Sequence, residues 1–436
     1  MWTYHPELLA TPVPRYTSFP TAAEFGDRVG ERDYREALQR SAGDISLYVH
    51  IPFCEKICWY CGCNTAAANR KQRLTAYLDA LHHEISLVGS LMGDVNVQRI
   101  SFGGGSPNAI APLDFVRLLD SLFVSFGPRA PDISIELDPR TLAPEWGQVM
   151  ASVGVTRASM GVQTFSPHLQ AAIGRVQPAE MIERATDMLR DAGVTSLNFD
   201  LMYGLPGQTL DDVEDSLRHA LRLGADRIAL FGYAHVPHMI PRQKQIDAHD
   251  LPGAQERFAM ALFGYNLLRD EGYVPVGFDH FARPGDSLAQ AALSGTLHRN
   301  FQGFTDDNAP VLIGLGASSI SCFPDLLVQN EKNAGRYRML LSQDRLTAAH
   351  GIARTQDDQR RGAIINDLLC RGRADIPDTM LRDALDRLDP YLAAGLCHWN
   401  VDHLEIPPEG LPYARSIAAA FDPYRQHSPR RFSSAV

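Results

Sequence analysis

The sequence predicts an α/β fold in which short strands and the helices between them form an open, partial (β/α)6 barrel. Six apolar runs have the length of strands buried on both faces of a parallel sheet. They lie at residues 45–51, 97–102, 133–137, 158–162, 196–202 and 227–231. Helical patterns separate several of these runs, at residues 74–88, 113–124, 179–192 and 210–223. Alternating strands and helices indicate parallel pairing, and six units rather than eight favour an open barrel.

Directly after the first predicted strand comes a loop that holds Cys54, Cys58, Cys61 and Cys63. The first three have the spacing C-x3-C-x2-C, which suits three corners of a cubic iron–sulfur cluster. A cluster held by three thiolates leaves one iron open to another ligand. The loop therefore predicts a [4Fe–4S] cluster bound through Cys54, Cys58 and Cys61.

Two other interpretations of the cysteines remain, a structural zinc site and oxidisable thiols. A structural zinc normally takes two separated ligand pairs, and the remaining cysteines, Cys322, Cys370 and Cys397, stand alone. Cys63 could complete an all-cysteine zinc site only in a very tight loop. Seven cysteines are ordinary for a chain of 436 residues, so no disulfide framework is indicated.

The second strand ends in Gly103-Gly104-Gly105, followed by Ser106. Consecutive glycines let the backbone approach a ligand closely and leave amide groups available to it, although many such runs are simply tight turns. Polar residues also follow the later strands: Glu136, Asp138, Gln163 and Asp200. In parallel α/β sheets ligands bind at the carboxyl ends of the strands, so these residues predict an active site there.

The pair of carboxylates after the third strand has two interpretations. Glu136 and Asp138 share one face of the strand end, where ionised carboxylates suit a ribose diol or an α-amino group. Asp138 could instead cap a helix or form an ion pair with Arg140. Before the fourth predicted helix, residues 206–209 offer a cap at Thr209.

Together these motifs resemble the radical S-adenosylmethionine (SAM) superfamily, and more narrowly the oxygen-independent coproporphyrinogen III oxidases. The resemblance covers nearly the whole chain, and its motifs lie at residues 14–20, 48–54, 135–139, 159–165, 174–175 and 198–206. It implies that two SAM molecules bind. It places around them Tyr48, Tyr60, Gly104, Gly105, Ser106, Glu136, Gln163, Arg175, Asp200, Ala234 and Ile320. His50, beside the cluster loop, is a candidate catalytic residue, although a lone histidine is more often structural.

The resemblance implies an oxidoreductase that removes a hydrogen atom and CO2 from two propionates of coproporphyrinogen III, giving the two vinyl groups of protoporphyrinogen IX. It also implies an electron donor of the flavodoxin or ferredoxin type. A haem chaperone on the same scaffold is an alternative, which the Cys-Gly-Cys ending of the loop disfavours. A related radical SAM methyltransferase or porphyrin-modifying enzyme is another, because Asp306-Asp307-Asn308 is acidic where the family is usually rich in Thr and Gly.

Three domains are expected along the chain. Residues 1–44 form an N-terminal arm with a lead-in helix, residues 45–350 form the barrel and a following segment, and residues 351–436 form a helical cap resembling a small winged-helix unit. A DNA-binding role for that unit is disfavoured, since no basic recognition helix is evident. Candidate partners for substrate carboxylates are Arg15, Arg242, Lys244, Arg283 and Arg299.

Composition limits the remaining possibilities. The chain is 45% hydrophobic and 21% charged, which is typical of a globular protein. Its net charge of −10 argues against nucleic acid as a partner. No secretory signal or membrane span is indicated, and free thiols suit a reducing compartment, so we expect a monomeric cytoplasmic protein.

Overall fold

The computed structural model describes residues 2–68, 71–127 and 129–426. Its centre is a mixed sheet whose six middle strands are parallel and adjacent. In spatial order they are β1 (Gly43–Ile51), β4 (Val95–Gly104), β5 (Asp132–Leu137), β6 (Val155–Gln163), β7 (Ser196–Tyr203) and β8 (Arg227–Gly232). These are the six predicted strands, so the predicted α/β core is confirmed.

The sheet extends beyond the predicted strands at both edges. Beside β1 lies the parallel strand β13 (Val311–Leu315), followed by the antiparallel strands β14 (Ile320–Phe323), β15 (Leu326–Asn330) and β16 (Ala348–Ala353). Beside β8 lie β10 (His280–Ala282) and β9 (Val274–Val276), both in antiparallel pairs. The sequence analysis did not predict these flanking strands.

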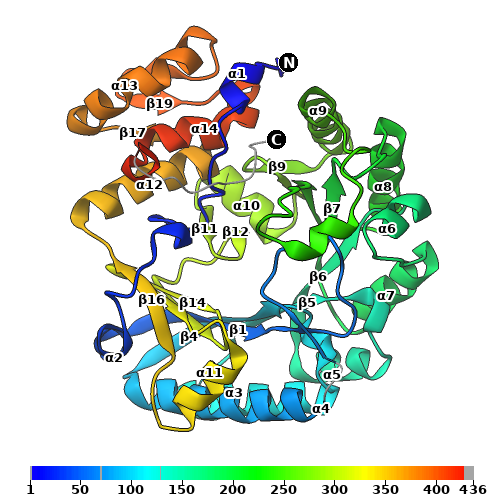
Figure 1. The fold of residues 1–436 in the computed structure, drawn as a ribbon, viewed down its shortest axis with the longest axis vertical. Coiled ribbons are helices and arrows are strands. Elements are labelled where there is room, and N and C mark those ends of the chain that lie inside the picture. Colours follow the sequence, from blue (N-terminus) through cyan, green and yellow to red (C-terminus); the bar gives the residue numbers. More distant parts are fainter. Residues whose placement is uncertain (1, 69–70, 128, 427–436) are drawn as a thin grey trace.

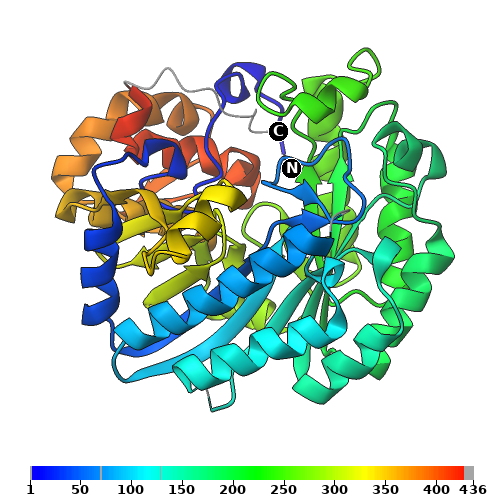
Figure 2. The ribbon, with the colours of Figure 1, turned by 60° about the horizontal axis from the view of Figure 1, so that its bottom comes forward.

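Helices cover the outer face of the parallel strands (Figures 1 and 2). They are α3 (Lys71–Leu91), α4 (Pro112–Phe126), α5 (Glu145–Val153), α6 (Pro167–Ala172), α7 (Ala179–Asp191), α8 (Leu210–Arg222) and α9 (Ala254–Asp270). The apolar faces of these helices other than α6 share one buried core with the strands, and Leu169 of α6 belongs to a separate small cluster. The hydroxyl of Thr209 accepts a hydrogen bond from the Asp212 amide, so the predicted cap of α8 is confirmed. Within the described ranges, no helix is both long and apolar enough to cross a membrane.

Short elements complete the chain. They are α1 (Pro6–Leu9), α2 (Glu31–Arg40), β2 (Phe53–Cys54), β3 (Ala66–Ala67), α10 (Ser287–Ser294), β11 (His298–Asn300), β12 (Gly303–Thr305), α11 (Ala334–Leu341), α12 (Gln356–Arg371), β17 (Arg373–Asp375), α13 (Asp378–Ala393), β18 (His398–Asn400), β19 (His403–Glu405) and α14 (Ala414–Ala418). Strands β17, β19 and β18 form a small antiparallel sheet beside α12 and α13. This arrangement agrees with the helices and β wing expected near the C-terminus.

The N-terminal arm packs on this C-terminal unit rather than lying free (Figure 1). Leu9, Val13, Tyr16 and Phe19 are buried in the same apolar cluster as side chains of α12, α13 and α14. The Tyr16 hydroxyl donates to a carboxylate oxygen of Asp422 at 3.0 Å. Segments some 400 residues apart in the sequence therefore share one core.

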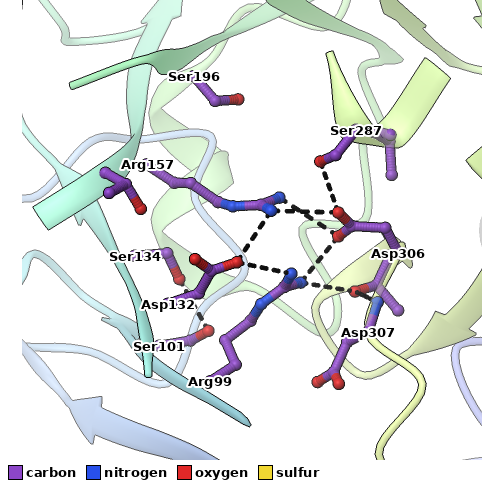
Figure 3. A network of polar contacts seen from close by, with 12 residues as sticks. Arg99, Ser101, Asp132, Ser134, Arg157, Ser196, Ser287, Asp306 and Asp307 are labelled. Carbon is purple, nitrogen blue, oxygen red and sulfur yellow. Dashed lines mark hydrogen bonds and ion pairs between the residues drawn. The ribbon is translucent and has the colours of Figure 1, made fainter. Parts of the chain in front are cut away.

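A network of ion pairs joins the strands toward their amino ends (Figure 3). Arg99 of β4 and Arg157 of β6 each contact the Asp306 carboxylate, at 2.9 and 3.1 Å, and also Asp132 of β5, at 3.4 and 3.0 Å. Ser287 of α10 donates to Asp306 at 2.5 Å. We call these five residues the amino-end network. The two guanidinium groups hold the pKa of Asp306 well below its usual range. Of the acidic loop that the sequence singled out, Asp306 is therefore neutralised by charge pairing, whereas the Asp307 carboxylate accepts from the Ala309 amide at 3.0 Å.

Candidate active site

One large cavity lies at the carboxyl ends of the parallel strands, and we call it the main cavity. Most of the predicted site residues line it: Cys54, Cys58, Tyr60, Cys61, Gly104, Gly105, Glu136, Gln163, Arg175, Asp200 and Ala234. They come from the cysteine loop and from β4, β5, β6, β7 and β8 or just after them, except Arg175, which lies between α6 and α7. Cys63 and Arg242 also line the cavity.

The cysteine loop is held at its base by backbone hydrogen bonds. Strand β2 pairs with β3, and the Ala68 amide donates to the Cys54 carbonyl at 2.8 Å. The amides of Gly105 and Ser106 donate to the carbonyls of Ile51 and Phe53, at 2.9 and 2.8 Å. A Cβ atom on Gly105 would lie 2.5 Å from the Phe53 carbonyl oxygen, so this position needs glycine. The Gly105 amide, which was expected to be available to a ligand, thus anchors the loop together with the Ser106 amide.

Cys58 lies between two arginines at the buried side of the loop. Arg140 and Arg175 each donate to its sulfur at 3.2 Å, and both also contact the Asp138 carboxylate. Asp138 is therefore engaged in the ion pair that was one of its two interpretations. These two donors hold the Cys58 sulfur in place on the buried side of the loop. The sequence analysis missed the contact of Arg140 with Cys58, and its only signal was the position of Arg140 two residues after Asp138.

The spacing of the thiols distinguishes a cluster from a single zinc ion. A tetrahedral zinc with bonds of about 2.3 Å brings its thiolates to within roughly 4 Å of one another. Among the four cysteines of the loop, all within the described part of the chain, no three sulfurs lie within 4.8 Å of each other. A cubic cluster spreads its thiolates more widely, because each binds a different iron. As they lie here, the thiols are spaced too widely for one zinc ion, whereas the C-x3-C-x2-C set suits a cluster.

Glu136 and Asp200 bring two carboxylates to the wall of the cavity. Glu136 accepts from the Gly104 amide at 3.2 Å, and Asp200 accepts from Asn198 at 2.8 Å and Ser159 at 3.4 Å. Dense surrounding protein, with a contribution from Asp200, raises the pKa of Glu136 to about 7. The Glu136 side chain is nonetheless exposed to the open cavity, and solvent there opposes part of this shift. Burial also raises the pKa of Asp200. Both carboxylates suit a cationic ligand that would stabilise their charged forms.

Gln163 adopts a strained backbone at the end of β6. Its φ of 68° lies in the left-handed region, which residues other than glycine rarely occupy. The pairing of β6 with β7 shifts register between Gly161 and Gln163, so the strand is irregular at this point. Such strain costs of order 1–3 kcal/mol and concentrates at ligand sites. It presents Gln163 to the main cavity.

Four predicted site residues lie outside the lining of the main cavity: Tyr48, His50, Ser106 and Ile320. Nδ1 of His50 lies 3.0 Å from the Tyr48 hydroxyl, and a Cβ atom on Gly104 would clash with the imidazole ring. Burial lowers the pKa of His50 to about 4, so the ring is neutral near pH 7. The Ser106 hydroxyl is buried and donates to Asn108 at 2.6 Å. His50 and Ser106 thus pack behind the glycine segment.

The basic residues proposed for substrate carboxylates are dispersed. Arg15 and Arg242 line the main cavity, whereas Lys244 and Arg283 do not. Arg283 contacts the Tyr273 hydroxyl at 3.3 Å. Arg299 donates to the backbone carbonyls of Arg15 and Tyr16, so it fixes the arm rather than facing the cavity.

Comparison with known proteins gives consistent results. Residues 48–220 match the family model of the radical SAM superfamily. The chain is 41% identical to the oxygen-independent coproporphyrinogen III oxidase of Bradyrhizobium diazoefficiens, over 97% of both chains. It is 36% identical to the Escherichia coli protein of the same name, over 97% of this chain and 96% of that one. A solved structure of the coproporphyrinogen III oxidase HemN from E. coli, described as a radical SAM enzyme, superimposes with a TM-score of 0.90 and covers 97% of this chain and 99% of that one.

Proposed function

The chain belongs to the family of oxygen-independent coproporphyrinogen III oxidases within the radical SAM superfamily, and we propose that it converts coproporphyrinogen III to protoporphyrinogen IX. Each of two propionate side chains loses a β-hydrogen atom, CO2 and one further electron, and becomes a vinyl group. The observation that carries this proposal is the main cavity, in which three thiols face carboxylates from neighbouring strands. Relatives of this name align over nearly the whole chain, including the C-terminal unit.

Membership of the superfamily implies a [4Fe–4S] cluster and SAM. When bound, they supply a 5′-deoxyadenosyl radical that takes a hydrogen atom from the substrate. Cys54, Cys58 and Cys61 hold the cluster in this proposal, since they have the C-x3-C-x2-C spacing and line one cavity. In this proposal two SAM molecules are used, Glu136 and Asp200 contact SAM, and Ala234 and Ile320 lie near adenosyl groups.

The side chains of the main cavity hold the cluster ligand Cys58, orient SAM and enclose the reacting propionate. Arg140 and Arg175 hold Cys58 in position, and Asp138 holds both arginines. Glu136 and Asp200 offer anionic oxygens to the amino group and ribose of SAM, and Gln163 adds an amide. Charge-assisted hydrogen bonds of this kind orient a ligand more strongly than neutral ones. The cavity walls exclude solvent from the reacting side chain.

The remaining partner assignments follow from charge and chemistry. Reducing equivalents come from a protein of the flavodoxin or ferredoxin type, and the enzyme works as a cytoplasmic monomer in this proposal. A net charge of −10 disfavours nucleic acid.

Anaerobic turnover tests the proposal. Reconstituted protein is incubated with SAM, a reductant and coproporphyrinogen III, and the tetrapyrrole is analysed by mass spectrometry. We expect loss of two CO2 and four hydrogens, with 5′-deoxyadenosine as coproduct. Tetrapyrrole that binds but keeps all four propionates would contradict the proposal and favour a haem chaperone. A gain of a methyl group would favour a methyltransferase.

A further inference from the structure

A second, more enclosed pocket lies beside the main cavity, and three arginines line it: Arg15, Arg257 and Arg415. We call it the arginine pocket. Most of its remaining wall is aromatic or aliphatic, with Trp2, Tyr203, Leu230, Phe258, Ala261, Tyr265, Phe278, Phe281 and Pro412. Strongly basic groups within apolar walls suit an anionic group at the end of an apolar arm.

The arginine pocket and the main cavity are neighbours. Arg15, Gly232 and Ala234 line both. Arg15 lies over the ring of Phe231, 5.1 Å from its centroid, at the end of β8. A ligand with several arms could therefore place one arm in each space.

Among the described residues, the lining of the arginine pocket holds three arginines and one carboxylate. Of the described residues that line it, Asp279 is the one carboxylate, and it contacts Nδ1 of His280 at 2.7 Å. Within the described ranges, neither Arg15 nor Arg257 makes an ion pair with a carboxylate. Arg257 donates to the Tyr233 carbonyl at 2.7 Å, and its buried Nε has no hydrogen-bond partner. Burial and nearby Arg15 lower the pKa of Arg415 to about 10, which still leaves it charged near pH 7.

Three distant parts of the chain supply these arginines. Arg15 belongs to the arm, Arg257 to α9 and Arg415 to α14. Arg299 supports the arrangement from behind by donating to the Arg15 carbonyl at 3.0 Å. The arginine pocket exists only when the arm and the C-terminal unit are both in place.

We propose that the arginine pocket binds the carboxylate of a propionate that is not decarboxylated, and so holds the tetrapyrrole with a reacting propionate in the main cavity. The inference rests on the proposed function, which requires a substrate with four propionates, two of which survive. Guanidinium groups bind carboxylates in a bidentate fork, and the aromatic walls suit the methylene arm. The same anion chemistry could come from the carboxylate of SAM, and the test separates the two sources.

The test uses the variants Arg257→Gln and Arg415→Gln in the full chain with its cluster reconstituted. Binding of coproporphyrin III, the stable oxidised form, is measured anaerobically by fluorescence. Loss of a charge-assisted hydrogen bond should weaken this binding roughly ten- to hundredfold. The cluster absorbance and the affinity for SAM should stay at wild-type values. Arg218→Gln, an exposed arginine on α8 paired with Glu214, is the matched control and should bind as the wild type does.

Each other outcome overturns the inference. Wild-type affinity for coproporphyrin III in both variants would show that the arginine pocket does not hold a propionate. Weaker SAM binding with unchanged coproporphyrin binding would assign the pocket to SAM. In the wild type, the tetramethyl ester should bind far more weakly than the free acid, and equal binding would contradict the inference.

Lysine variants and a turnover measurement on the wild type complete the experiment. If a glutamine variant does not retain its cluster, the lysine variant at the same position replaces it. Lysine keeps the charge but loses the fork, so we expect at least about fivefold weaker binding, and no change would overturn the inference. Wild-type turnover is measured in parallel. Absence of conversion by the wild type would contradict the proposed function, whereas wild-type conversion with unaffected variants would contradict only this inference.

Discussion

The two ends of the same parallel strands carry charged side chains in contrasting states. Toward the amino ends, Arg99, Asp132 and Arg157 on β4, β5 and β6 are joined to Asp306 in the amino-end network. Toward the carboxyl ends, the same strands contribute Gly104, Glu136 and Gln163 to the main cavity. At the amino ends, the closed end, the charged side chains are paired with one another. At the carboxyl ends, the open end, they line a cavity.

The number of donors to a carboxylate and the direction of its pKa shift distinguish a structural charge cluster from a binding site. Each oxygen of Asp306 has a donor, and its pKa is held well below the usual range. Glu136 receives one amide hydrogen bond, and its pKa is raised. Carboxylates with raised pKa in a cleft are ones that a cationic ligand would stabilise. The contrast predicts that changes at one end alter ligand binding and changes at the other alter stability.

The largest effect is expected from the cysteines at the open end. Replacing Cys54, Cys58 or Cys61 by Ala should remove the cluster absorbance of anaerobically reconstituted protein and abolish SAM cleavage, because each would supply one of three ligands. Replacing Cys63 by Ala is the control and should leave the cluster largely intact. A Cys58→Ala protein that still holds a full cluster would refute the assignment.

The closed end should govern stability. Asp306→Ala leaves two guanidinium groups with only Asp132 between them and should lower the free energy of unfolding by about 3 kcal/mol, measured by urea denaturation. Because the folded-state pKa of Asp306 is depressed, its contribution is present above about pH 4 and is lost as the pH falls further. Asp270→Ala, at an exposed pair with Arg269, is the control and should cost under about 1 kcal/mol. Equal losses of unfolding free energy in Asp306→Ala and Asp270→Ala would contradict a special structural role for the amino-end network.

Asp200→Asn sharpens the comparison because it changes charge without changing size. A lost charge-assisted hydrogen bond costs about 1.5–3 kcal/mol, so SAM affinity should fall roughly ten- to hundredfold in equilibrium binding. The cluster spectrum and the urea midpoint should stay close to those of the wild type. Unaltered SAM binding here and in Glu136→Gln would place both carboxylates outside the SAM site.

The smallest expected effect is the pH dependence of SAM affinity. With its pKa raised to about 7, Glu136 is largely protonated at pH 6 and gains charge as the pH rises. Affinity for the cationic amino group of SAM should therefore increase several-fold from pH 6 to about 7.5, with a midpoint below 7 because the side chain meets solvent. Glu136→Gln should flatten this dependence. A wild-type SAM affinity that stays constant between pH 6 and about 7.5 would contradict this role of Glu136.

The sequence predicted the parts of the fold that repeat. Apolar runs such as the one that forms β7 are long, and the helices between them show clear periodicity. Of the flanking strands, β9, β10 and β14 have only three or four residues, too few for a pattern, whereas the length of β13, β15 and β16, five or six residues, does not explain why they escaped prediction. Helix α5 is short and contains Gly147, which weakens its helical signal.

The candidate site was predictable where motifs follow strand ends. Glu136, Gln163 and Asp200 line the main cavity because parallel strands bring their carboxyl ends to one edge. The contacts of Arg140 with Cys58 and of Arg257 with the arginine pocket were not predictable, since they depend on how loops and α9 fold back. A sequence pattern does not contain that tertiary information.

The shared core of the arm and the C-terminal unit has a consequence for biosynthesis. Leu9, Val13, Tyr16 and Phe19 leave the ribosome early, but their packing partners in α12, α13 and α14 emerge more than 300 residues later. At roughly 5–20 residues per second, the arm waits some tens of seconds for its partners. During that time the arginine pocket is incomplete, because Arg415 of α14 has not yet been synthesised. We therefore expect the order of synthesis to allow cluster assembly before the arginine pocket is complete.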